Sequence, residues 1–363
     1  MNNLAQYRMD LHKIPELGFE EFKTQEYILN IVKNFNCTIH KVKTGLILHF
    51  DNNADRTIAV RADMDALPIQ EATNLKFAST HLGIMHACGH DGHMAILLGL
   101  AQWLNDNYTT LDKNIILVFQ PSEERDAGAS AIIESGILQE HHVEAIFGLH
   151  LWSGKKKGSI WTRINEFMAA ANEVDIEISG RASHVANSAL GIDALHVASQ
   201  FLTHAYEMEA KLPKEIFRLV KFGEMHSGSV RNVISDVAKI YGTIRSYDPA
   251  IHTHLQTELQ RIADIYDTKF GTTTLITYKD GYDAVINDSE LVAHVKKSIP
   301  AINEMEKPVL QAEDFGLYRK ICPTMFMFLG VGDTAPLHNE LFDFDMDVLN
   351  DGLNLFIDIV RNY

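Results

Sequence analysis

Apolar positions over the first 165 residues predict a mixture of helices and strands. A helix near the N-terminus has one apolar face, formed by Ile28, Ile31, Val32 and Phe35. Further apolar runs predict a buried helix at 94–104 and four strands, at residues 44–50, 57–65, 115–124 and 144–152. Strands that alternate with helices in this way favour an α/β layer structure.

The pattern changes near residue 170. Residues 174–180 alternate apolar and polar side chains, as a half-solvated strand does. The segments that follow complete a β-α-β-β-α-β order, with a helix at 190–210, strands at 218–225 and 237–246, a helix at 250–268 and a strand at 273–281. This order is typical of a small α+β sandwich with one open face.

From residue 285 the helical and buried-strand pattern returns, with a core strand at 325–331. We therefore expect an α/β catalytic domain, with a mixed sheet between helices, over residues 1–168 and 280–363. An α+β domain at 169–279 would be inserted into it, so that the catalytic domain is split in sequence. A tandem of two unsplit domains is the alternative.

Composition narrows the class of protein. The 363 residues (40.8 kDa) carry 32 basic and 48 acidic side chains, a net charge of −16, which argues against nucleic acid or an anionic membrane as the main partner. No apolar run approaches the roughly 18–20 residues of a membrane span, and the start resembles no secretory signal. We expect a cytoplasmic protein. The 18 His against only three Cys make metal chemistry the first hypothesis to test.

The densest group of candidate ligands lies in residues 86–93. These eight residues hold three His, one Cys and one Asp, a set suited to zinc and its neighbours. Gly89 and Gly92 allow the backbone to bend tightly there. The alternative interpretation is a His-rich surface loop before a helix, which would be favoured if only one such residue were present.

Other candidates follow predicted strands. Glu123 and Glu124 point in opposite directions if the segment is extended, so one could bind a metal while the other moves a proton. Taken alone, the pair fits better as solvated acids that open a helix. His150 and His338 also lie where strands pass into loops, although a single His in such a place is more often structural. Asp63 ends a strand and could instead pair with Arg61.

Together these segments resemble a known family. The chain is similar to the metallopeptidase and amidohydrolase superfamily of aminoacylase, carboxypeptidase G and succinyl-diaminopimelate desuccinylase, and within it to the branch of hippurate hydrolase and auxin-conjugate hydrolase. The shared stretches are DLHKIPELGFEEFKT, AVRADMDALPI, MHACGHDGH, FQPSEE, GLH, GRASH, RNVI, GTIRSYD, AEDFGLY and LHN. The opening stretch and AEDFGLY look most like those of N-acetyldiaminopimelate deacetylases.

The resemblance implies a site with two divalent metal ions: zinc, manganese, nickel or cobalt. The ligands would be Cys88, His90, Glu124, His150 and His338. Cys88 would lie between the two cations as a thiolate, because metal coordination deprotonates a thiol. Asp63 would orient the metal ligands without binding a metal itself.

The same resemblance implies the catalytic roles. Glu123 would be the general base that activates water and then protonates the amine. His184, in the inserted domain, would stabilise the oxyanion, either on lid closure or from a partner subunit. Asn232 and Arg245 would hold the substrate's carboxylate, although Arg245 could equally be an exposed strand residue. A homodimer that pairs through the inserted domain is expected.

The function expected is removal of an acyl group, here acetyl, from N-acetyl-diaminopimelate in lysine biosynthesis. The enzymatic alternative is a broader N-acyl-amino-acid hydrolase acting on N-acetylcysteine or benzoyl-glycine; a dipeptidase or carboxypeptidase is less favoured. A catalytically silent metal-binding homologue is the non-enzymatic alternative, which the intact Glu123 disfavours. Two loops depart from the family pattern, SHVANSALGIDA and PSEERDAGA, and both weaken the identification of the substrate rather than of the ligands.

Overall fold

The computed structural model describes residues 3–279 and 281–363, and these form two compact units. The first unit comprises residues 1–167, 286–307 and 314–363, and the second comprises 168–285 and 308–313. The chain therefore leaves the first unit once at residue 168 and returns to it at residue 286, apart from the short excursion at 308–313. No helix in the described part of the chain is long and apolar enough to cross a membrane.

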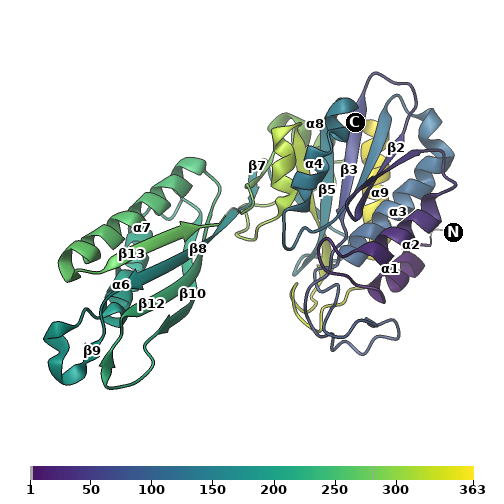
Figure 1. The fold of residues 1–363 in the computed structure, drawn as a ribbon. Coiled ribbons are helices and arrows are strands. Elements are labelled where there is room, and N and C mark those ends of the chain that lie inside the picture. Colours follow the sequence, from purple (N-terminus) through teal and green to yellow (C-terminus); the bar gives the residue numbers. More distant parts are fainter. Residues whose placement is uncertain (1–2, 280) are drawn as a thin grey trace. The chain divides into compact units, whose positions relative to one another are not determined.

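The first unit is built on an eight-stranded mixed sheet. Its strands are ordered β1-β2-β4-β3-β5-β16-β6-β15. Figure 1 labels β2, β3 and β5 of this sheet. Their bounds are β1 Thr38–Val42, β2 Gly45–Phe50, β3 Thr57–Asp63, β4 Asn114–Gln120, β5 Val143–Ser153, β6 Ile160–Thr162, β15 Asn303–Glu304 and β16 Thr324–Gly332. The central strands β4, β3, β5 and β16 are parallel. Strands β1 and β2 run antiparallel to their neighbours, and β6 is antiparallel to β16 but parallel to β15.

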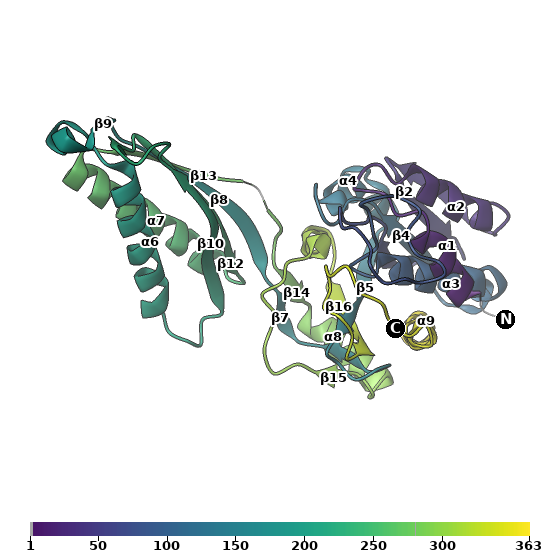
Figure 2. The same cartoon turned by 90° about the horizontal axis from the view of Figure 1, so that it is seen from below.

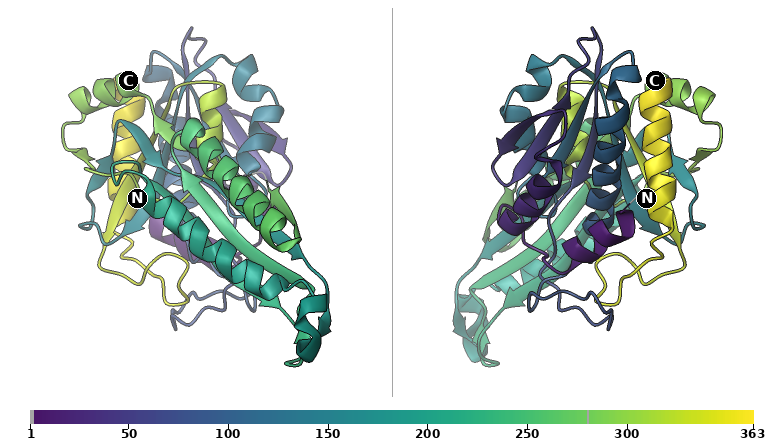
Figure 3. Two further views of the ribbon diagram at one scale, coloured as in Figure 1. Left: turned by 90° about the vertical axis from the view of Figure 1, so that its left-hand side faces the viewer. Right: turned by 90° about the vertical axis from the view of Figure 1, so that its right-hand side faces the viewer.

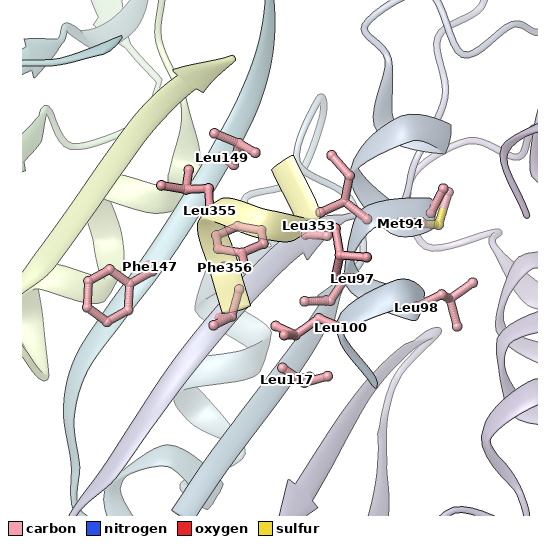
Figure 4. Close-up of a cluster of buried hydrophobic side chains, with 14 of the residues drawn as sticks. Met94, Leu97, Leu98, Leu100, Leu117, Phe147, Leu149, Leu353, Leu355 and Phe356 are labelled. Carbon is pink, nitrogen blue, oxygen red and sulfur yellow. The ribbon is translucent and has the colours of Figure 1, made fainter. Parts of the chain in front are cut away.

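Helices cover both faces of this sheet. They are α1 Leu4–His12, α2 Phe22–Val32, α3 His90–Asn107, α4 Gly128–Glu134, α5 Ile137–Glu140, α8 Ser289–Ser298 and α9 Val348–Asn362, with short 3-10 segments at Tyr108–Thr110 and Asp314–Lys320. The main core lies between the sheet and α3 and α9, where Leu97 and Leu100 face Leu353 and Phe356 (Figure 4). Figure 1 shows α4 on the opposite face of the sheet. The central parallel strands are thus buried on both sides, as their apolar runs predict.

The second unit is a four-stranded antiparallel sheet, ordered β10-β12-β8-β13, with two helices on one face (Figures 2 and 3). The elements are β8 Ala170–Ser179, α6 Ala194–Lys211, β10 Arg218–Ser227, β12 Val237–Ser246, α7 Pro249–Phe270 and β13 Thr273–Tyr278. Short strands β9 Ser183–His184 and β11 Val233–Ile234 pair beside a 3-10 segment at Val185–Leu190, and β7 Asn165–Met168 pairs with β14 Val285–Asn287. Alternate residues of β8, such as Val174 and Ile176, face the helices, and ion pairs such as Lys239–Glu177 lie on the other face.

The predicted α/β class is confirmed, and the long elements lie where the apolar patterns place them. Two local expectations were incomplete. The N-terminal helix is two helices, α1 and α2, separated by a segment that contains Pro15, which cannot donate a helical hydrogen bond. Strand β1 was missed because it is an edge strand with mostly solvent-accessible side chains and therefore has no apolar run.

Candidate metal centre

The candidate site lies at the carboxyl ends of three parallel strands of the first unit. Asp63 is the last residue of β3, Glu123 and Glu124 follow β4, and His150 is near the end of β5. Because β3 runs parallel to both β4 and β5, these residues emerge at one edge of the sheet. In open α/β sheets this edge is where ligands bind.

Cys88 and His90 come from the turn that opens α3. Gly89 adopts φ 86°, a left-handed conformation that suits a residue without a Cβ, and His90 is the first residue of the helix. The Nδ1 atom of His90 lies 2.9 Å from the backbone oxygen of Asp65. Because Nδ1 donates this hydrogen bond, a neutral His90 presents the lone pair of Nε2 for binding a metal.

Three further side chains, His150, His338 and Glu124, approach Cys88 and His90 closely enough to share metal ions. The Sγ of Cys88 lies 3.4 Å from His150 Nε2 and 3.3 Å from His338 Nε2. The Oε1 of Glu124 lies 3.2 Å from His338 Nε2 and 3.8 Å from His90 Nε2. Cys88 therefore belongs to two groups of ligand atoms, one with His90 and His150 and the other with Glu124 and His338, each within 4.8 Å.

The donor atoms fit divalent transition metals. The Nε2 of His90 and the Oε1 of Glu124 are buried and make no hydrogen bond in the structure. Buried polar atoms are normally satisfied, so both atoms point to a partner such as a cation. Imidazole, thiolate and carboxylate together suit zinc, manganese, nickel or cobalt.

Local electrostatics favour filling the site with positive charge. Burial, together with the charges of Glu124, Glu123 and Asp63, raises the pKa of Cys88 well above its ordinary value. Burial lowers the pKa of His150, which keeps its imidazole neutral as a ligand requires. A cation would relieve the clustering of acids and would favour the thiolate of Cys88.

His338 closes the site from a strained position. Its φ is 65°, which is uncommon for a residue with a Cβ, and its N–H donates to the backbone oxygen of Ala87 at 2.9 Å. About half of its side chain is exposed to solvent (51%). The site is therefore open on the side of His338.

Asp63 connects the site to a buried polar network. Its carboxylate lies 2.6 Å from His93 Nδ1 and 2.7 Å from a guanidinium nitrogen of Arg61. Burial raises the pKa of Asp63, but the charges of His90, His93 and Arg61 outweigh burial and hold it well below its ordinary value. The predicted pairing with Arg61 and the predicted place beside the ligands both occur.

Asp314, of the AEDFGLY stretch, extends this network from the far end of the chain. It accepts hydrogen bonds from Arg61 at 2.9 Å and from the side chain of Gln120 at 2.8 Å. Its backbone N–H donates to Oε1 of Glu123 at 3.4 Å. The carboxylate of Glu123 therefore contacts the backbone of Asp314, while one of its oxygens also lies within 4.8 Å of the ligand atoms of His90 and Glu124.

The backbone turn of Ser122–Glu124 is held by two carboxylates. Asp65 accepts hydrogen bonds from the amides of Glu123 at 3.0 Å and Glu124 at 2.9 Å, and Glu21 accepts one from the amide of Ser122 at 2.8 Å. Ser122 has φ 51°, a left-handed conformation that costs a residue with a Cβ about 1–2 kcal/mol.

Sequence reasoning left four buried contributors without a role. They are Glu21, Asp65, His93 and Asp314. Asp65 lies two residues after Asp63, the last residue of β3, and His93 lies in the His-rich segment, so both could have been found from their motifs. Glu21 and Asp314 lie in two of the shared stretches, DLHKIPELGFEEFKT and AEDFGLY, but they act across 101 and 191 residues, on Ser122 and Glu123, so the sequence did not show their roles.

The three candidates in the second unit fall into two places within it. His184 pairs with Val233 in the β9–β11 ribbon, and the N–H of Val185 donates to the backbone oxygen of Asn232. Arg245 lies near the opposite end of β12, where its guanidinium donates to the backbone oxygen of Leu310 at 2.7 Å. The structure thus brings His184 and Asn232 together and does not bring Arg245 beside them.

The geometry can be set beside known proteins. Residues 59–362 match the model of peptidase family M20/M25/M40. The chain is 33% identical to N-acetyldiaminopimelate deacetylase of Oceanobacillus iheyensis over the whole of both chains, and 35% identical to the deacetylase of that name from Shouchella clausii, covering 94% of this chain and 92% of the other. A solved Bacillus subtilis structure, described as a dinuclear metal-binding peptidase of family M20, is similar with a TM-score of 0.86 at 30% identity, covering 99% of this chain and 97% of that one.

Proposed function

The chain belongs to peptidase family M20/M25/M40, and on this premise we propose that it is a metal-dependent deacetylase of N-acetyl-diaminopimelate. It is an amidohydrolase of that family; the acetyl group and the amino acid are our proposal. Support comes from the names of the relatives that span its whole length and from the DLHKIPELGFEEFKT opening. The reaction would release acetate and diaminopimelate, in the cytoplasm, as a step of lysine biosynthesis.

We propose two divalent ions, and the observation that carries this proposal is the shared position of Cys88. One ion would be held by Cys88, His90 and His150, and the other by Cys88, Glu124 and His338, since these are the two groups of converging ligand atoms that contain Cys88. The similar Bacillus subtilis protein is itself described as binding two metals. Bound cations of this kind polarise an amide carbonyl and make water more acidic.

Glu123 is the residue that moves the proton. Its side chain is 5% exposed, adjoins the ligand Glu124 in sequence, and is turned toward the backbone amide of Asp314. In this position its carboxylate takes a proton from the attacking water and passes it to the departing amine. Because the amine leaves protonated, the amide C–N bond breaks without forming a strongly basic anion.

The second unit supplies the remaining proposed roles. The Nδ1 of His184 accepts a hydrogen bond from the N–H of Ala186 at 3.1 Å, so in a neutral ring the proton lies on Nε2. That Nε2–H is suited to donate to an oxyanion. We assign carboxylate binding to Asn232 and Arg245, and we propose a homodimer formed through this unit, whose sheet has two edges, β10 and β13.

The substrate is tested with a panel of N-acyl amino acids. Metal-free protein would be reconstituted separately with zinc, manganese, nickel or cobalt and assayed on N-acetyl-diaminopimelate, N-acetylcysteine, benzoyl-glycine and a dipeptide. We expect the highest kcat/KM on N-acetyl-diaminopimelate. Comparable rates on many simple acyl amino acids, with none on the diaminopimelate, would replace the proposal with a broad N-acyl-amino-acid hydrolase. Complete inactivity with every metal would indicate a silent homologue.

A further inference from the structure

The segment between α1 and α2 reaches the turn that carries the proposed general base. The carboxylate of Glu21, in this segment, accepts a hydrogen bond of 2.8 Å from the backbone N–H of Ser122, the residue directly before Glu123. The backbone oxygen of Glu16, in the same segment, accepts a hydrogen bond of 2.8 Å from the backbone N–H of Ala66, the residue directly after Asp65. The carboxylate of Asp65 in turn accepts hydrogen bonds from the backbone N–H groups of Glu123 and Glu124. Three consecutive amides of the turn are therefore bound by two side chains.

Glu21 occupies a position where its side chain would ordinarily serve its own helix. It is the N-cap residue of α2, yet its carboxylate makes no capping hydrogen bond. Instead it is fully buried and accepts hydrogen bonds from Ser122 N–H and from the hydroxyl of Thr44 at 2.5 Å. Burial raises the pKa of Glu21 to about 7. The buried position therefore disfavours the ionised form of the Glu21 side chain.

The turn needs stabilising contacts from other segments because the backbone of Ser122 is in the left-handed conformation. Its φ of 51° is disfavoured for a residue with a Cβ, and such conformations persist when the surroundings impose them. The segment of Glu21 also packs directly on it: a Cβ added to Gly18 would lie 2.4 Å from Ser122 Oγ. The fit leaves little room for Ser122 to move on that side.

We propose that Glu21 is a positioning residue that holds the Ser122 turn and so fixes the direction of the Glu123 carboxylate. The proposal rests on the proposed function for Glu123. Glu123 and Glu124 both have an oxygen within 4.8 Å of His90, but Asp314 N–H donates to Glu123, whereas His338 Nε2 lies 3.2 Å from Glu124. Releasing Ser122 lets the peptide before Glu123 rotate, which displaces its carboxylate while the ligand set stays together.

The kinetic test compares Glu21→Leu with Glu21→Gln. Leu keeps volume but removes both acceptors, so we expect kcat to fall by about tenfold to a hundredfold with KM changed less than about twofold. Metal content should match the wild type. Gln can accept from Ser122 N–H while Thr44 accepts from its amide, so we expect activity near wild type. Equal losses in the two variants would overturn the proposal. Glu20→Gln, an exposed neighbour, is the matched control.

A double variant tests whether the hold acts through the left-handed residue. Glycine adopts positive φ without a Cβ penalty. Ser122→Gly should therefore restore part of the kcat lost in Glu21→Leu, and should change the wild type much less. No recovery in the double variant would contradict action through Ser122. If Glu21→Leu does not fold, Glu21→Met carries the same comparison.

Hydrogen exchange gives a readout that does not depend on activity. In metal-loaded protein, the amides of Ser122–Glu124 should exchange at least about tenfold faster in Glu21→Leu than in wild type, Glu21→Gln or Glu20→Gln. If exchange responds but no N-acyl amino acid is hydrolysed by the wild type, the proposed function fails and the hold by Glu21 stands. If the wild type is active and exchange is unchanged in Glu21→Leu, the hold is overturned.

Discussion

At the scale of single residues, two neighbouring glutamates both lie near His90 but differ in their other contacts. Glu124 lies among His338, His90 and Cys88, whereas the Glu123 carboxylate meets the backbone amide of Asp314. The left-handed Ser122 and the two hydrogen bonds to Asp65 create this division. A ligand and a proton carrier can therefore lie side by side in sequence.

Glu123→Gln should abolish turnover without removing metal. The amide has nearly the same shape but cannot accept the proton of the attacking water, and general acid–base groups contribute about 10²–10⁴-fold to rate. We expect kcat to fall by at least about a hundredfold while metal content, measured by mass spectrometry of the digested protein, stays at the wild-type value. Substantial activity in the metal-loaded variant would contradict the assignment. The exposed Glu134→Gln is the control.

Cys88→Ala should lose metal from both ligand groups. Its sulfur is the atom that the groups share, so its removal weakens both proposed ions. We expect metal content to fall toward zero after dialysis, with activity lost in parallel. Cys37 is a half-buried thiol, and burial raises its pKa to about 11. The control variant Cys37→Ala should therefore retain the wild-type metal content. Retention of one full ion in Cys88→Ala would show that the thiolate is not shared.

At the scale of elements, helix α1 is attached to the start of α3 by buried charges. Arg8 and His12 of α1 both contact Asp91, the second residue of α3, at 3.2 and 2.8 Å. Arg8 also donates to the backbone oxygen of Phe344 at 2.9 Å and lies over its ring. The N-terminal helix thereby supports the turn that carries Cys88 and His90.

His12 should make stability depend on alkaline pH. Burial lowers its pKa, but the charge and hydrogen bond of Asp91 and the hydrogen bond of Glu71 outweigh this and raise it to about 9. Because the folded value exceeds the ordinary 6.5, the stabilisation is complete below about pH 6.5 and is lost as pH rises through 9. We expect the free energy of unfolding to fall by on the order of 2–3 kcal/mol over that range.

Urea titrations of the metal-loaded protein at pH 6.5 and 9.5 measure this change. His12→Asn, which can still donate a hydrogen bond to Asp91 but carries no proton to lose, should show a smaller difference between the two pH values. The same pH dependence in both proteins would assign the effect to other groups.

At the scale of the whole molecule, the proposed chemistry draws on both units. The ligands and Glu123 belong to the first unit, and His184, Asn232 and Arg245 belong to the second. In a homodimer, His184 could be supplied to a site by the same chain or by the partner chain. Two edge strands in the second unit, β10 and β13, offer a means of pairing two copies.

Mixing two inactive variants decides whether His184 acts across a dimer. Glu123→Gln and His184→Ala should each be nearly inactive alone. Random mixing makes half of the dimers hybrid, and each hybrid has one site with both groups intact if His184 comes from the partner. We therefore expect about a quarter of wild-type activity after co-expression. No recovery would place His184 in the same chain as its site, and a monomer by light scattering would remove the dimer altogether.

The sequence by itself determined the α/β class, the long elements and the candidate ligands of the proposed metals. Buried parallel strands need continuous apolar runs, and a β-α-β-β-α-β unit with one open face needs alternation, so both patterns are local and readable. The metal-binding candidates also lie in short motifs, because Cys88 and His90 share one turn and Glu123 and Glu124 share another. Edge strand β1 escaped because exposed strands carry no apolar run.

Only the tertiary structure decided how these motifs meet. The shared place of Cys88 between two ligand groups depends on the order of β4, β3, β5 and β16 in the sheet. The hydrogen bonds of Glu21 with Ser122 and of Asp314 with Arg61 join segments more than a hundred residues apart. A side-chain hydrogen bond requires atoms within about 3 Å, and strand order and register, which no local pattern encodes, decide which distant atoms come that close.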